Sequence, residues 1–152
     1  MGSTGSVTLH INAPPERVYE LVSDVTRMGE WSPECRKCEW LDGQVGAAVG
    51  ARFKGSNQSG FIKWSTTAEV VAAEPGRTFA FTTKSRDKES TRWRYEFTAA
   101  DGGTDVTESY EAVWAPALVD LLERIFMRNR EQKIEVGMQT TLERIKAVAE
   151  RA

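Results

Sequence analysis

The sequence predicts an α+β fold in which an antiparallel sheet of about seven strands wraps around one long C-terminal helix. The helix is indicated by residues 129–149, where apolar side chains recur at spacings of three and four. About a hundred residues before it alternate between apolar and polar side chains, as strands with one buried face do. Such a helix is expected to pack on the sheet. Its predicted buried stripe consists of Ile134, Met138, Thr141, Leu142, Ile145 and Val148.

The length and charge of the chain limit the classes of protein to which it can belong. A chain of 152 residues is expected to form one domain, residues 1–152, with its own core. The net charge of −2 gives no reason to expect nucleic-acid binding. No apolar run approaches the roughly 18 residues needed to cross a membrane, and the N-terminus does not resemble a signal peptide. We therefore expect a cytoplasmic protein without a membrane span, either a monomer or a homodimer.

The N-terminal part of the chain predicts one strand followed by two short helices. Apolar residues at positions 7, 9 and 11 alternate with polar ones, which predicts a half-buried strand with His10 on its polar side. Pro14 and Pro15 end that strand, and proline suits the first turn of a helix, which is expected to continue to about Asp24. A second helical turn is expected over residues 25–30. Residues 31–33 (Trp-Ser-Pro) are expected to end it, because the residue before a proline avoids the α region.

The middle of the chain predicts a series of strands joined mostly by short turns. Residues 74–76 (Glu-Pro-Gly) and 101–103 (Asp-Gly-Gly) are typical turn sequences. Strands connected in this way are antiparallel. The predicted strands cover residues 39–41, 50–58, 61–73, the stretch that contains Phe79, Phe81 and Thr83, the stretch that contains Trp93, Tyr95 and Phe97, and residues 104–112.

A second helical segment is predicted between the last strand and the C-terminal helix. Its apolar stripe, which includes Leu118 and Ile125, does not continue into the stripe that contains Ile134. Either the helix breaks between the two segments, or one continuous helix presents two faces to two neighbours. We favour a break near residues 128–130, with Asn129 near a cap, and expect residues 118–127 to cover one mouth of an internal cavity.

The predicted inner face of the sheet is rich in aromatic residues, interrupted by small and polar ones. For any single aromatic side chain, packing in the core is the stronger interpretation. Small residues such as Gly55 leave space, however, and polar groups within an apolar lining orient ligands in pockets. Gly137 on the helix either makes further space or allows close packing of the helix on the sheet. The sequence therefore predicts a ligand cavity lined by Trp31, Phe53, Asn57, Trp64, Thr66, Phe81, Trp93, Tyr95, Tyr110, Arg130, Ile134 and Met138.

Glu108 is the candidate catalytic residue, because its position in the strand places a carboxyl group on the inner face beside Val106 and Tyr110. A buried carboxylate is costly unless it is paired, and an unpaired one takes a raised pKa. Arg130 is a candidate partner for it. A β-bulge that shifts the register by one residue would instead place Glu108 in water. The residues leave both interpretations open.

Other residue sets that carry catalysis or bind metals do not occur in the sequence. There is no GxSxG, no HExxH and no glycine loop that would cradle a phosphate. Cys35 and Cys38 form a CxxC pair, but with His10 they fall short of the roughly four ligands of a structural zinc site. We therefore predict no metal and no cofactor. The two cysteines are interpreted as reduced thiols at a loop-to-strand junction, with a reversible disulfide as the alternative.

The predicted order of elements resembles the START-like helix-grip superfamily, also called SRPBCC. The resemblance covers nearly the whole chain. It is most specific in INAPPERVYELVSDVTRMGEWSPEC (residues 11–35), GARFKG (50–55), VVAAEPGRTFAF (70–81) and GMQTTLERIKAVAE (137–150). These segments look like the actinobacterial polyketide cyclase/dehydrase subgroup. The resemblance implies a curved sheet and a long helix that enclose an apolar cavity.

The resemblance and the inner-face pattern together lead to three expectations about function. The first is the binding of a small hydrophobic ligand, lipid-like or polyketide-like, in the internal cavity. The second is a polyketide aromatase/cyclase or dehydratase that uses cavity residues such as Glu108. The third is a protein-interaction or stress-response module without a ligand. The subgroup offers no catalytic motif that can be placed on this sequence, so whether the protein is an enzyme stays open.

Overall fold

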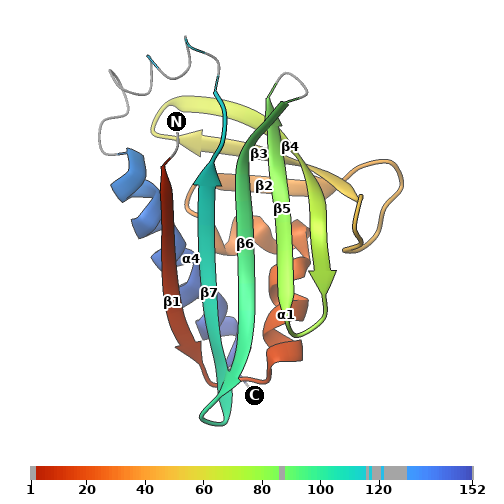
Figure 1. The fold of residues 1–152 in the computed structure, drawn as a ribbon, viewed down its shortest axis with the longest axis vertical. Helices are drawn as coiled ribbons and strands as arrows, with labels where there is room; N and C mark the ends of the chain where they lie inside the picture. Colours follow the sequence, from red (N-terminus) through yellow and green to blue (C-terminus); the bar gives the residue numbers. More distant parts are fainter. Residues whose placement is uncertain (1–2, 86–87, 116, 118–120, 122–129, 152) are drawn as a thin grey trace.

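The structure is a computed structural model that describes residues 3–85, 88–115, 117, 121 and 130–151. The chain begins with a strand, continues through short helices into six further strands, and ends in a long helix (Figure 1). The elements are β1 (Thr4–Ile11), α1 (Pro15–Ser23), the 3₁₀ turn η1 (Val25–Arg27), α2 (Met28–Trp31), β2 (Cys35–Trp40), β3 (Arg52–Ser59), β4 (Ile62–Glu74), β5 (Thr78–Ser85), β6 (Lys88–Ala100), β7 (Gly103–Ala112) and α4 (Arg130–Ala149).

The strands form one antiparallel sheet in the order β1-β7-β6-β5-β4-β3-β2. The first strand therefore pairs with the last, while the other strands follow one another as neighbours. Figure 1 shows β2 and β3 running across the molecule behind β5 and β6, so the sheet curves around the face on which α1 and α4 lie. The prediction of about seven antiparallel strands around a C-terminal helix, preceded by two short helices, is confirmed for the described residues.

The buried face of α4 is the one that its sequence periodicity predicts. Leu142 and Ile145 are fully buried and belong to the main core cluster, together with Val18 of α1 and Val106 of β7. Met138 is also buried, while Ile134 is half-buried. The predicted break near residues 128–130 and the segment expected to cover a cavity mouth, residues 118–127, fall largely outside the described residues. No helix in the described part of the chain is long and apolar enough to cross a membrane.

Strand β2 differs most from its prediction. It begins at Cys35 rather than at Glu39, because a β-bulge between Cys35 and Lys37 allows the chain to pair with β3 earlier than its alternation suggests. Cys35 therefore lies where the loop meets the strand, as predicted, whereas Cys38 lies within the strand. Further register shifts lie between Val70 and Ala72 and in the β5–β6 pairing. No shift is recorded in the pairing of β7 with β6 or β1, so the alternation around Glu108 is regular.

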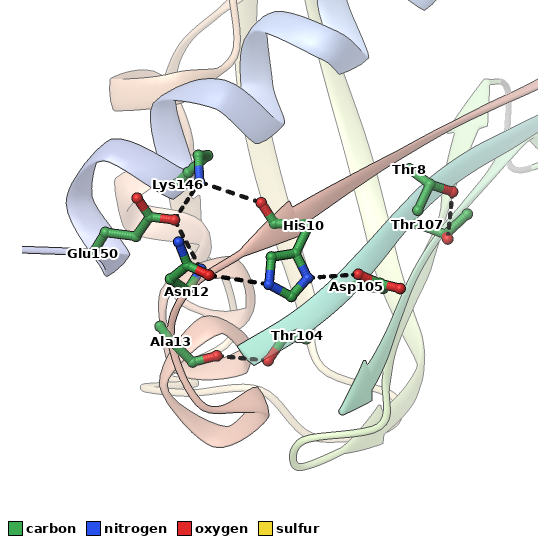
Figure 2. A network of polar contacts seen from close by, with 9 residues as sticks. All are labelled: Thr8, His10, Asn12, Ala13, Thr104, Asp105, Thr107, Lys146 and Glu150. Carbon is green, nitrogen blue, oxygen red and sulfur yellow. Dashed lines mark hydrogen bonds and ion pairs between the residues drawn. The ribbon is translucent and has the colours of Figure 1, made fainter. Parts of the chain in front are cut away.

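A polar network attaches the end of α4 to the end of β1 (Figure 2). His10 lies on the polar side of β1, as predicted, with Nδ1 2.7 Å from Asp105 Oδ1 and Nε2 3.1 Å from Asn12 Oδ1. Lys146 of α4 donates to the His10 carbonyl oxygen over 3.4 Å and also contacts Glu150. The Glu150 carboxylate accepts the backbone N–H of Asn12 over 2.8 Å. These contacts fix the helix against one edge of the sheet.

We expect the pKa of His10 to lie above 6.5. The hydrogen bond to Asp105 raises this pKa by favouring the imidazolium, whereas burial acts in the opposite direction. The stability that the contact adds is then complete below the unfolded pKa of about 6.5 and is lost as the pH rises through the folded pKa. Because His10 is the one histidine in the sequence, an NMR titration of its ring protons measures this pKa directly. Asp105→Asn should lower it, and a wild-type value at or below 6.5 would contradict the expectation.

Candidate ligand-binding cavity

A cavity of about 960 Å³ lies between the inner face of the sheet and α4, as the described residues define it. Its wall is made by residues of β2 to β7, by the link between α2 and β2, and by α4 as far as Arg144. This volume lies at the upper end of the range of about 300–1,000 Å³ that is usual for small-molecule sites. The cavity is therefore large enough for a molecule of several rings or a long acyl chain.

Most of the residues predicted to line a cavity do line this one. Trp31 does not, because it is 2% exposed and packs in the hydrophobic core, with the Arg27 guanidinium 5.2 Å from its ring centre. Trp31 instead holds the short helices against the core. The side chain of Arg130 lies outside the described part of the structure. The predicted residues found in the wall are Phe53, Asn57, Trp64, Thr66, Phe81, Trp93, Tyr95, Tyr110, Ile134 and Met138, together with Glu108.

The aromatic part of the wall is a continuous series of ring contacts across four strands. Phe53 on β3 packs edge-on against Phe81 on β5, with ring centres 5.1 Å apart. Phe81 in turn stacks on Trp93 of β6 at 6.5 Å, and Trp93 contacts Tyr110 of β7 at 5.6 Å. Such contacts hold the rings in fixed orientations. One side of the cavity is therefore bounded by aromatic rings that hold one another in place.

Polar groups interrupt this apolar wall at a few places. Asn57 Nδ2 donates to Thr66 Oγ1 over 3.2 Å, on neighbouring strands β3 and β4. Arg144 of α4 also lines the cavity and donates to the carbonyl oxygen of Trp31 over 3.4 Å. A small number of fixed polar groups within an apolar lining is the arrangement that orients a bound molecule.

Glu108 points inward and is 4% exposed, so the alternative in which a bulge turns it into water is not what the structure contains. The hydroxyl of Tyr95, its cross-strand neighbour, donates to Glu108 Oε2 over 2.9 Å. The other oxygen, Oε1, is buried and has no hydrogen-bond partner among the described residues. Burial raises the pKa of Glu108 to about 8, although the hydrogen bond from Tyr95 acts to lower it. At neutral pH the carboxyl group is therefore largely protonated.

Tyr95 is held in its neutral form by the same surroundings. Burial raises the pKa of Tyr95 well above its usual value, and the nearby Glu108 carboxyl raises it further. The pair thus forms a buried, neutral donor–acceptor unit in the cavity wall, a carboxylic acid next to a phenol. A carboxylic acid kept neutral at physiological pH can donate a hydrogen bond or a proton to a bound molecule.

Gly137 faces the cavity from α4. A Cβ atom placed at Gly137 would have only Pro33 Cγ, at 3.9 Å, within 4 Å, which is ordinary van der Waals contact. Of the two interpretations of this glycine, close packing of the helix on the sheet is therefore wrong, and the residue leaves space in the cavity. A larger side chain at this position would project toward the link between α2 and β2.

Cys35 and Cys38 line the cavity, which the alternation of residues in the sequence does not predict. Residues three apart in a regular strand point to opposite faces, so the spacing alone places only one of them inward. The bulge in β2 brings both to the inner face. Their Sγ atoms lie 3.4 Å apart, and both thiols are free. Met28, whose Sδ lies 3.7 Å from Cys38 Sγ, is another cavity residue that the pattern did not predict.

The fold defines a class of protein, the helix-grip domains, in which a curved antiparallel sheet packs around a long C-terminal helix. Residues 4–150 match the family model described as polyketide cyclase/dehydrase and lipid transport, and the chain belongs to this family. The match confirms the SRPBCC-like, polyketide cyclase/dehydrase-like character that the sequence segments indicated. None of the curated proteins compared with the chain is significantly similar to it.

Solved structures agree with this assignment. The polyketide cyclase-like protein Cgl2372 from Corynebacterium glutamicum is 35% identical, with 99% of this chain and 86% of that chain covered and a TM-score of 0.55. Two others share the fold at lower identity. The Zhui aromatase/cyclase from Streptomyces sp. R1128 is 16% identical over 99% of this chain and 95% of that chain, with a TM-score of 0.76. Protein CV1439 from Chromobacterium violaceum is 20% identical over 98% of both chains, with a TM-score of 0.72.

Proposed function

We propose that this protein binds a small hydrophobic molecule, lipid-like or polyketide-like, in the cavity between the sheet and α4. The observation that carries the proposal is a cavity of about 960 Å³ whose wall is a fixed series of aromatic rings with a few polar groups. Burial of apolar ligand surface against such a wall contributes roughly 25 cal/mol per Å². The family description, which includes lipid transport, supports the same class of ligand.

The binding proposal is tested with ligands of graded shape. Native mass spectrometry of gently purified protein would detect a molecule retained from expression. Titration with fatty acids and with multi-ring polyketides, followed by tryptophan fluorescence, reports directly on the cavity because Trp64 and Trp93 line it. We expect saturable binding at micromolar concentrations. The absence of both a retained species and saturable binding would overturn the proposal and favour a protein-interaction module.

A second candidate function is a cyclisation or dehydration of a polyketide-like substrate, with Glu108 as general acid. It is favoured by one observation, the buried carboxyl group in the cavity wall with Oε1 unpartnered among the described residues and a pKa raised to about 8. The Zhui aromatase/cyclase, which has the same fold, supports this candidate function. Glu108→Gln keeps the acceptor for Tyr95 and removes the acid. Turnover of a polyketide substrate should then fall by about 100-fold or more with affinity nearly unchanged, whereas unchanged turnover would exclude Glu108 from the role.

A further inference from the structure

The two cysteines of β2 are arranged to react with each other inside the cavity. Cys35 and Cys38 are only 4% and 5% exposed, both face the cavity, and their sulfur atoms are 3.4 Å apart. Gly55, opposite Cys38 on β3, leaves the space beside the thiol open, since a Cβ there would lie 3.3 Å from Cys38 Sγ. An irregular strand thus places two thiols side by side in the wall of an apolar cavity.

The two thiols are not equivalent. The Cys38 thiol and the backbone N–H of Lys37, next to the bulge, both act to lower the pKa of Cys35, against the effect of burial. The hydrogen bond to Cys35, followed by burial, raises the pKa of Cys38. Because the thiolate is the reactive form of cysteine, we expect Cys35, which also accepts from the backbone N–H of Lys37, to act as the nucleophile of the pair.

We propose that Cys35 and Cys38 form a redox-active dithiol that reduces an organic hydroperoxide bound in the cavity. The Cys35 thiolate attacks the terminal oxygen of the hydroperoxide, so that an S–O bond forms and the O–O bond breaks. The alkoxide takes up the proton that the Cys35 thiol released and leaves as an alcohol. The Cys38 sulfur then displaces hydroxide from the Cys35 sulfenic acid, which yields a disulfide and water. The two thiols together lose two electrons, and the hydroperoxide gains them.

The apolar lining of the cavity indicates which class of oxidant would reach the two thiols. Both sulfur atoms are shielded from bulk solvent and are reached through an aromatic-lined space, which favours an apolar hydroperoxide over hydrogen peroxide. The inference therefore rests on the proposal that the cavity admits small hydrophobic molecules. It does not depend on which molecule is the natural ligand.

A single-turnover experiment tests the dithiol. The reduced full-length protein is mixed anaerobically with one equivalent of cumene hydroperoxide, and intact mass and released alcohol are measured. We expect the loss of two hydrogen atoms per chain and one alcohol per disulfide. Cys38→Ser should stop at a sulfenic acid on Cys35 that dimedone traps, and Cys35→Ser should react at least about 10-fold more slowly. Circular dichroism confirms that both variants are folded.

Several outcomes would overturn the proposal. These are the absence of the disulfide, equal rates for the two serine variants, oxygen found on Met28 instead, or hydrogen peroxide reacting faster than cumene hydroperoxide. Gly137→Leu, which projects into the cavity beside Pro33, should slow the reaction with cumene hydroperoxide more than that with hydrogen peroxide. Ligand titration of the double Cys35→Ser/Cys38→Ser variant separates the two proposals, because binding should persist there even if the redox inference fails.

Discussion

Glu108→Gln is expected to make the protein more stable at neutral pH, by roughly 3 kcal/mol at pH 7. Burial raises the folded-state pKa of Glu108 to about 8 from its ordinary value of 4.5. Between these two values the unfolded chain releases the proton while the folded chain keeps it, so folding becomes less favourable as the pH rises. Each pH unit in this window costs about 1.4 kcal/mol. Glutamine has no proton to lose and escapes this cost, while its side-chain oxygen can still accept the hydrogen bond from Tyr95.

The measurement is chemical unfolding of wild type and variant at a series of pH values between 4.5 and 8. The two proteins should be similarly stable at the acid end and diverge as the pH rises. Glu111→Gln is the matched control, because Glu111 lies on the exposed face of the same strand and pairs with Arg92 at 3.2 Å. It should change stability by no more than about 0.5 kcal/mol. A Glu108→Gln variant less stable than wild type at pH 7 would mean that the folded protein holds an ionised, paired carboxylate.

The carboxyl group of Glu108 lowers the stability of the fold at neutral pH, which fits a functional role for this residue better than a structural one. Glutamine at this position is expected to stabilise the fold, yet the chain carries a carboxyl group that contacts Tyr95 through one oxygen and has its other oxygen unpartnered among the described residues. Proteins retain destabilising groups of this kind where function requires them. The stability gain in Glu108→Gln and its loss of turnover or ligand orientation are therefore two consequences of one arrangement.

Regular periodicity explains which features could be predicted from the sequence. The stripe of α4 and the inward phase of Glu108 depend on repeats of 3.6 and 2 residues, and the structure keeps both repeats intact in these elements. Two features depend on breaks in regularity or on tertiary packing. The bulge at Cys35 has no signal in the local pattern, so the alternation predicts a loop-to-strand junction and does not predict that both cysteines face the cavity. Trp31 ends a four-residue helix, and only the packing of that helix decides that its ring enters the core.

The variant expected to have the largest effect on binding is Gly137→Leu, which should weaken ligand affinity by about 100-fold, or about 2.7 kcal/mol. Gly137 lines the cavity, and a Cβ there would find no atom nearer than Pro33 Cγ at 3.9 Å. The leucine side chain therefore enters space that the ligand would occupy. The fold should tolerate it, because leucine favours a helix more than glycine does and would bury apolar surface.

Gly137→Ala is the control that separates the filling of the cavity from a change in the helix. Alanine makes the same improvement in helix propensity and should stabilise the protein by about 1 kcal/mol, yet it adds one methyl group only. Its ligand affinity should stay within about threefold of the wild type, a change of less than 1 kcal/mol. Tryptophan fluorescence titration and chemical unfolding of all three proteins give both quantities. If Gly137→Leu binds as the wild type does, the ligand does not occupy the space between α4 and the α2–β2 link. If both variants lose stability, the helix needs glycine for close packing after all.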